Sequence, residues 1–139
     1  MTVTEEERHK NLQDLEGVDW GEPQFPSHLV TTCHRLHRTP LQDFTVEDLR
    51  IMIGQQLGLP YLVPLALEYL RVNPFVCGDF GPGDLLSVVM RVEPAFWLAH
   101  PNLWHATNDS VIMELQHAYE QFSRDLPTFE AWGHKAEGS

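Results

Sequence analysis

Cysteine is scarce in this chain of 139 residues, which contains only Cys33 and Cys77. Two cysteines are too few for the disulfide framework that supports many small secreted domains. We therefore expect both side chains to be free thiols in a reducing compartment, packed as small hydrophobic groups in the interior.

Long apolar runs are missing as well, since no stretch approaches the roughly 20 residues that a helix needs to span a bilayer. The first residues, MTVTEEERHKN, do not join a basic region to an apolar core, which is the pattern of a secretory signal. Internal repeats, linkers and low-complexity segments are also absent. These features predict a cytoplasmic protein with one domain, long enough to bury a core.

Basic residues are few, with 9 Lys and Arg against 20 Asp and Glu, for a net charge of −11. The excess acid lies at the ends: residues 1–25 carry seven acids and two bases, and residues 108–139 carry six acids and two bases. Such a field argues against binding to nucleic acid, which needs Lys and Arg to displace counterions. It would attract a basic protein, although the same charge also serves solubility alone.

Catalytic motifs are missing too, including a nucleophile elbow and a dinucleotide fingerprint. The glycine-rich stretch 78–83 lacks the Lys-Ser/Thr ending of a phosphate-binding loop. Asp79 and Asp84 flank this turn and could act as a general acid and base, but capping and turn roles are more typical of such residues. We therefore predict that the protein is not an enzyme and has no catalytic residues.

A metal site is incomplete in this sequence. Cys33, His34 and His37 have a spacing that can bind zinc from one face of a helix, but no second ligand pair completes the site. His100 and His105, which lie between aromatic residues, are expected to be structural. We predict no bound metal and no cofactor.

The segment that is present and organises the chain runs over 44–70 and predicts two consecutive helices. Thr45 and Asp48 have the spacing of a capping box. Gly58 is expected to end the first helix in a left-handed conformation, and Pro60 fits the first turn of the second. The apolar positions of both helices predict the core of the domain, with Leu49, Ile53, Leu65 and Leu70 buried.

Other segments predict shorter helices around this pair. Helices are expected over 28–38, with Ser27 as the N-cap, over 85–92, and from about 110 to about 124; a strand is an alternative for 85–92 because of Val88 and Val89. A short polar helix near 4–14 and short turns at 94–98 and 101–104 complete the pattern. Trp20, in the loop 17–23, is expected to anchor that loop to the core, with an exposed binding role as the alternative.

Together these segments predict an all-α fold, a single compact domain of five to seven helices over 1–139. The two ends, residues 1–10 and 134–139, are expected to fray.

Several blocks of the sequence, spread over residues 12–92, resemble one protein family. The blocks are Trp20-Gly21-Glu22-Pro23; Ser27-His28-Leu29-Val30 with Cys33-His34 and Pro40-Leu41; Glu47-Asp48-Leu49-Arg50 with Ile53-Gly54-Gln55; Tyr61-Leu62 with Pro64-Leu65-Ala66-Leu67-Glu68; and Gly78-Asp79-Phe80 with Pro82-Gly83-Asp84-Leu85-Leu86. In their order and spacing they resemble the immunity proteins of bacterial contact-dependent growth inhibition (CDI) systems. Gly81 departs from the pattern, because the family would have an aromatic residue before Pro82.

This resemblance implies a protein that binds the C-terminal toxin domain of a CDI adhesin in a heterodimeric complex and neutralises it in the cytoplasm, commonly by covering the active site. It implies a nuclease as the toxin, and an acidic inhibitor suits a basic nuclease. Exposed acids are the predicted partner-binding residues, namely Asp79, Asp84, Glu114, Glu120 and Asp125. The alternatives are a small α-helical enzyme and an acidic adaptor that binds another basic partner; nucleic acid, membrane and small-molecule partners are not expected.

Overall fold

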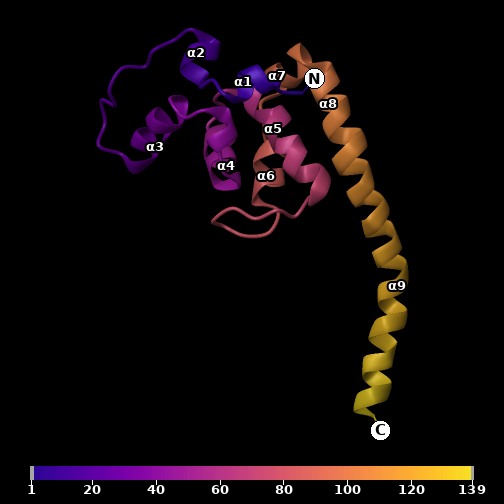
Figure 1. Cartoon of the computed structure of the whole chain (residues 1–139). Helices are drawn as coiled ribbons and strands as arrows, with labels where there is room; N and C mark the ends of the chain where they lie inside the picture. Colours follow the sequence, from indigo (N-terminus) through magenta and orange to yellow (C-terminus); the bar gives the residue numbers. More distant parts are fainter. Residues whose placement is uncertain (1, 139) are drawn as a thin grey trace.

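The computed structural model describes residues 2–138 and confirms the all-α fold, because no strand occurs in that range (Figure 1). One isolated bridge, between Cys77 and Pro82, is the only β-type pairing in the described part of the chain. The helices in chain order are α1 (Glu5–Arg8), α2 (Leu12–Glu16), α3 (His28–His37), the 3-10 helix η1 (Leu41–Asp43), α4 (Val46–Gly54), α5 (Leu59–Val72), α6 (Asp84–Met90), α7 (Pro94–Ala99), α8 (Pro101–Thr107), the π-helical segment η2 (Asn108–Ile112) and α9 (Met113–Glu137).

The predicted central pair is α4 and α5. Thr45 and Asp48 form the capping box at the start of α4, each side chain accepting a hydrogen bond from the backbone N–H of the other residue. Gly58 has a left-handed φ of 63°, as predicted, although α4 already ends at Gly54. A Cβ at Gly58 would lie 2.7 Å from Cδ1 of Leu12, so glycine is required there for space as well as for conformation.

The core lies around this pair, and the four residues predicted for it, Leu49, Ile53, Leu65 and Leu70, are buried. Helices α3 and α6 pack against α4, and α6 and α8 pack against α5. The segment 85–92 is helical in α6 rather than a strand, and it contributes Leu85 and Val89 to the core.

The N-terminal segment packs on the body, which differs from the prediction that residues 1–10 fray. Among residues 2–10, Val3 is buried, Arg8 pairs with Glu68 of α5 at 2.7 Å, and the carbonyl of Lys10 accepts a hydrogen bond from the N–H of Leu41 at 3.0 Å. Thr4 and Glu7 also form a capping box on α1. Met1 lies outside the described residues, as does Ser139 at the other end.

The chain is helical without a break from α8 through η2 into α9, so the prediction that Asp109 or Ser110 caps a new helix is wrong. Thr107, Asn108 and Met113 all have right-handed helical dihedrals, and Ser110 donates its hydroxyl hydrogen to the carbonyl of Ala106. A serine that bonds to the carbonyl four residues earlier continues a helix instead of capping one. The extra width of the π-helical turn accommodates the junction.

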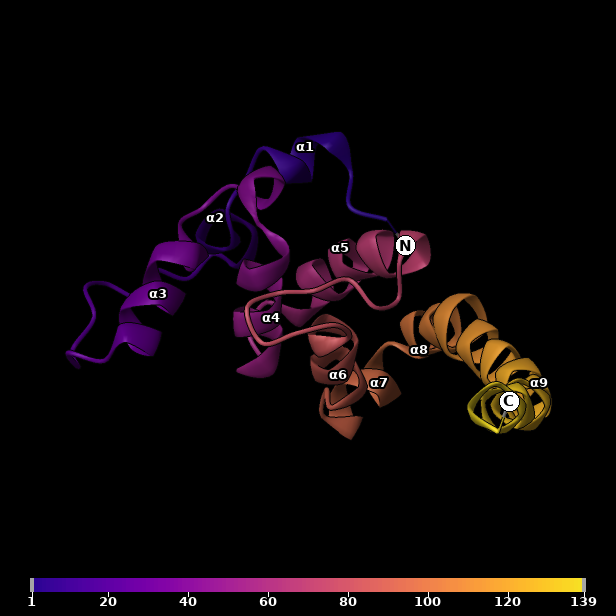
Figure 2. The same cartoon turned by 90° about the horizontal axis from the view of Figure 1, so that it is seen from below.

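Helix α9 leaves the body as a long arm (Figures 1 and 2). The sequence predicts that this helix ends at about Arg124 and that residues beyond Gly133 fray, but α9 continues through Pro127 to Glu137. Proline at this position removes one helical hydrogen bond without ending the helix. No side chain of α9 is buried, so the compact body consists of the helices before it.

Within residues 2–138, no helix has both the length and the apolar character that crossing a membrane requires.

Candidate protein-binding surface

The loop after α5 is folded around the carboxylate of Asp84. This carboxylate accepts hydrogen bonds from the backbone N–H groups of Gly78 at 2.7 Å, Phe80 at 3.1 Å and Gly81 at 3.3 Å. A carboxylate with three backbone hydrogen bonds stabilises the conformation of the loop. Asp84, predicted to contact a partner, therefore shapes the loop from within, while the neighbouring Asp79 is exposed.

Arg50 supports the same loop from α4. Its Nε donates to Glu47 Oε1 at 2.6 Å, and its guanidinium carbon lies 4.2 Å from the ring centroid of Phe80. The hydrogen bond from Arg50, followed by the one from the backbone N–H of Asp79, lowers the pKa of Glu47. A Cβ at Gly78 would lie 2.6 Å from Glu47 Oε1, so a larger residue there would displace the carboxylate that Arg50 binds. The result is a preorganised loop that presents the ring of Phe80, which is 81% exposed.

The other predicted acids lie elsewhere. Glu114, Glu120 and Asp125 are exposed along α9, and Asp125 accepts a hydrogen bond from Gln121 at 3.0 Å. Figure 1 shows the arm and the loop that follows α5 as separate parts of the molecule. The five predicted acids therefore form two groups, one on the loop and one on the arm.

A continuous apolar surface, which the sequence did not predict, joins the body to the arm. Met90 borders three neighbouring hollows: one with Trp97, Leu98 and Trp104, one with Trp97, Trp104 and Ile112, and one with Ile112, Leu115 and Tyr119. We call the residues that line it the α6–α9 apolar surface; they are Met90, Trp97, Leu98, Trp104, Ile112, Leu115 and Tyr119. A contiguous exposed apolar surface is typical of sites that contact another protein.

A signal for this surface does exist in the sequence. Trp97 and Trp104 each follow a proline by three residues, so two short helices begin alike and each carries a tryptophan at the same place. The sequence predicted these short helices but not that their tryptophans would share one face with residues of the arm.

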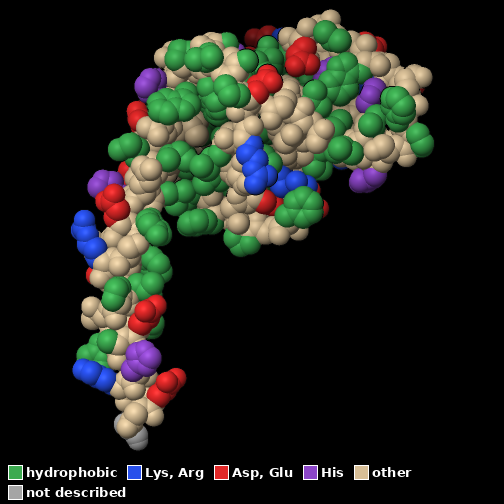
Figure 3. Space-filling model, turned by 180° about the vertical axis from the view of Figure 1, so that it is seen from behind, with side chains coloured by type: hydrophobic (Ala, Val, Ile, Leu, Met, Phe, Trp, Pro, Cys, Tyr) green, Lys and Arg blue, Asp and Glu red, His purple; other side chains and the backbone are tan. Residues whose placement is uncertain are grey.

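Hydrophobic side chains continue outward from this surface along the arm. Tyr119, Phe122, Phe129 and Trp132 are all exposed. Figure 3 shows hydrophobic groups along the side of the arm that faces the space below the body, with acidic groups between them and beyond. The arm therefore combines apolar area with negative charge, a pairing that suits a protein partner bearing apolar and basic groups.

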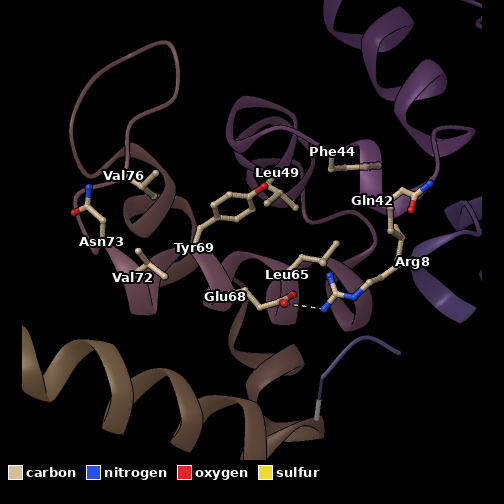
Figure 4. A pocket seen from close by; sticks show the side chains of 11 residues that line it. Arg8, Gln42, Phe44, Leu49, Leu65, Glu68, Tyr69, Val72, Asn73 and Val76 are labelled. Carbon is tan, nitrogen blue, oxygen red and sulfur yellow. Dashed lines mark hydrogen bonds and ion pairs between the residues drawn. The ribbon is translucent and has the colours of Figure 1, made fainter. Parts of the chain in front are cut away.

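A separate groove lies beside α5 (Figure 4). It has a volume of about 450 Å³ and mainly apolar walls that include Phe44, Leu65 and Tyr69, with the ion pair of Arg8 and Glu68 at one end. Tyr69 is 41% exposed in this groove. The groove is wide enough for an apolar side chain of a partner, but both charges within it are already paired.

The histidines next to Cys33 have structural contacts. His37 is 1% exposed, its Nε2 lies 2.8 Å from Glu16 Oε1, and its ring stacks on Trp20 with 3.7 Å between centroids. Trp20 thus anchors its loop to the body, as predicted. His34 Nδ1 lies 3.2 Å from the carbonyl of Gly21, and the described residues contain no cluster of three or more His, Cys, Asp or Glu side chains placed to hold a metal.

His100 was predicted to be structural, and both cysteines were predicted to be buried free thiols. The ring of His100 stacks on Phe96, consistent with a structural role. Both cysteines are free; Cys33 is buried as predicted, and burial raises the pKa of its thiol. Cys77 is exposed, so the prediction that it packs in the interior is wrong: it lies in the loop shaped by Asp84, at the molecular surface.

Comparison with known proteins identifies a family. The model of the family described as CDI immunity proteins matches residues 14–106, which is more than half of the chain. The searches of curated proteins and of solved structures gave no match.

Proposed function

The chain belongs to the family of CDI immunity proteins, and from this premise we propose that it neutralises a nuclease toxin domain of a CDI adhesin by binding over its active site. The family match over residues 14–106 is the observation that carries this proposal. The complex is a heterodimer formed in the cytoplasm of the protected cell.

The charge of the chain supports a nuclease as the partner. A nuclease needs a basic surface to bind the phosphates of its substrate, and this chain has a net charge of −11. Exposed acids, including Asp79 on the loop and Glu114, Glu120 and Asp125 on the arm, face solvent where such a surface could meet them. An acidic protein bound there competes with the substrate for the same basic groups.

The alternative of a small enzyme loses its proposed acid–base pair. Asp84 accepts three backbone hydrogen bonds and its side chain is mostly buried, so it is poorly placed to exchange protons with a substrate. No specific contact favours the adaptor alternative over the immunity function.

Co-expression tests this function directly. The toxin domain encoded by the adhesin gene of the same locus is induced in cells with and without this chain, and the purified toxin is assayed for nuclease activity with increasing amounts of it. We expect protected cells, a 1:1 complex in gel filtration, and loss of nuclease activity at equimolar ratio. Equal killing in both strains, with no complex, would refute the immunity function; a complex that leaves the nuclease site open to a short substrate would refute active-site blocking alone.

A further inference from the structure

Helix α9, together with Ile112 at the end of η2, carries a hydrophobic seam with the spacing of a coiled coil. Its residues follow one another at intervals of three, four, three, four and three positions. They are Ile112, Leu115, Tyr119, Phe122, Leu126 and Phe129. We call these six residues the α9 seam. Alternation of three and four places side chains in one stripe that fits between the side chains of a second helix.

Beyond its first turn, no other element of the described chain packs against the α9 seam. Ile112 and Leu115 pack partly against the core, whereas Tyr119 and Phe122 are exposed and Phe129 is 75% exposed. A solvated helix is only marginally stable by itself, and Pro127 and Gly133 weaken this one further. A partner that packs on the seam would supply the burial that the arm lacks.

The residues beside the seam decide between partners by their charge. The positions that flank it are Gln116, Ala118, Ser123, Asp125, Glu130 and Trp132, so the two charged residues among them are both acids. In a parallel pair of two copies of α9, Asp125 would face Glu130 of the second copy. In an antiparallel pair, neither acid meets a Lys or Arg at a flanking position. Two copies of this chain therefore repel each other along the seam, whereas a helix flanked by Lys or Arg is attracted.

We propose that the α9 seam docks on a helix of the toxin domain that has an apolar stripe flanked by Lys or Arg. This inference rests on the proposed function and names the surface that performs it. The seam continues the α6–α9 apolar surface through Ile112, Leu115 and Tyr119, so one partner can cover arm and body together. The family model matches residues 14–106, so the arm lies outside the matched part, as a surface that recognises one cognate toxin would.

The experiment measures the dissociation constant of the purified toxin domain for the full chain and for variants of α9. Phe122→Glu and Phe129→Glu place a carboxylate in the seam, and each is expected to raise the Kd at least tenfold. Ala131→Glu is the matched control, because it adds the same charge on the opposite face of the arm, where the Kd should change less than twofold. Circular dichroism checks that all variants keep their helix content.

The two acids that flank the seam are tested separately. The double variant Asp125→Lys/Glu130→Lys should also raise the Kd at least tenfold, because it would put Lys opposite the basic flanks of the toxin helix. Sedimentation of the chain alone should show a monomer.

The outcomes separate this inference from the proposed function. If the wild-type chain neutralises the toxin and the seam variants bind as tightly as Ala131→Glu, the docking seam is refuted while the immunity function stands. A chain that forms a dimer by itself, lost in Phe122→Glu, would identify a second copy as the occupant and refute the toxin helix. If the double Lys variant binds unchanged, the flanks of the partner are not basic. If the wild-type chain fails to bind the toxin at all, the proposed function itself falls.

Discussion

Arg50 is the residue on which the loop after α5 depends. One guanidinium group contacts the Glu47 carboxylate, lies over the Phe80 ring and comes within 3.9 Å of the Asp84 carboxylate. These contacts join α4, the loop and the start of α6. Their strength requires the carboxylates to be ionised, so pH should act on the loop through Glu47.

Acid should weaken the protein partly through Glu47. The pKa of this carboxyl is lowered from its usual 4.5 in the folded state, so ionised Glu47 stabilises the fold above pH 4.5. That contribution is lost as the pH falls from there through the lower, folded pKa. We expect Glu47→Gln to be less stable than the wild type at pH 7 and to lose less of its stability between pH 5 and pH 3. Urea unfolding at several pH values measures this, and parallel profiles for both proteins would contradict it.

Leu65 tests the core at single-residue scale. Leu65→Ala should lower the free energy of unfolding by about 2–5 kcal/mol, because the substitution removes buried methyl groups and leaves a cavity. The effect should fall toward the lower end, since Leu65 also borders the groove beside α5, where the surroundings can adjust. Leu98→Ala removes the same atoms from a side chain that is 83% exposed, so its urea midpoint should hardly move. Equal losses in the two variants would show that Leu65 is not a core residue.

At the scale of helices, the central pair was predictable because its signals are local. The capping box of Thr45 and Asp48, the left-handed Gly58 and the apolar spacing all act within a few residues, and all are present in α4 and α5. The structural role of Asp84 was not predictable in the same way. Its partners are backbone N–H groups that come together only in the folded loop. The sequence therefore indicates an acidic residue near a turn but not its hydrogen bonds.

The junction of α8 and α9 shows why the last helix was misjudged. Asp109 and Ser110 are common N-caps, and Pro127 is a common helix breaker, so local preference predicts a start and an end at these places. The helix already running through α8 overrides the first preference, because Ser110 bonds backward to Ala106. Glu114 and Glu120 lie within the predicted helix, whereas Asp125 lies just beyond its predicted end near Arg124, and the apolar seam was missed because that helix continues to Glu137.

The outer half of the arm should respond to its proline. Pro127→Ala restores one backbone hydrogen bond and removes a residue that costs about 3 kcal/mol in a helix interior. We expect slower amide hydrogen exchange over residues 124–137, with the exchange of core amides in α5 nearly unchanged. Unchanged exchange in the arm would show that Pro127 does not limit its stability.

The whole molecule consists of a packed body, most of which the family model matches, and a projecting arm, which it does not match. Residues 14–106, which match the family, form most of the body, whereas the arm lies beyond them. The net charge of −11 is concentrated in the terminal segments, one of which is the arm. A basic toxin should therefore be attracted toward the arm as well as toward the acidic N-terminal segment.

Salt should slow the association of the two proteins. At 0.15 M ionic strength the screening length is about 8 Å, so exposed charges farther apart than this attract each other only weakly. The on-rate should therefore fall markedly between low and physiological salt. The triple variant Glu114→Gln/Glu120→Gln/Asp125→Asn should have a lower on-rate and a weaker salt dependence, with a smaller change in off-rate. Stopped-flow mixing with the toxin domain measures both rates. An on-rate insensitive to salt and to the triple variant would exclude electrostatic steering.

The π-helical segment Asn108–Ile112 sets the rotational phase of the arm. Each residue of an α-helix turns the chain by about 100°, so one residue more or fewer in this turn aims every later side chain in a new direction. Deleting Asp109 would keep the composition, length and charge of the arm nearly intact while turning its apolar stripe away from Met90 and Trp104. Two homologues with identical arms could thus differ in partner through a single inserted residue at this turn, with no change in any residue that touches the partner.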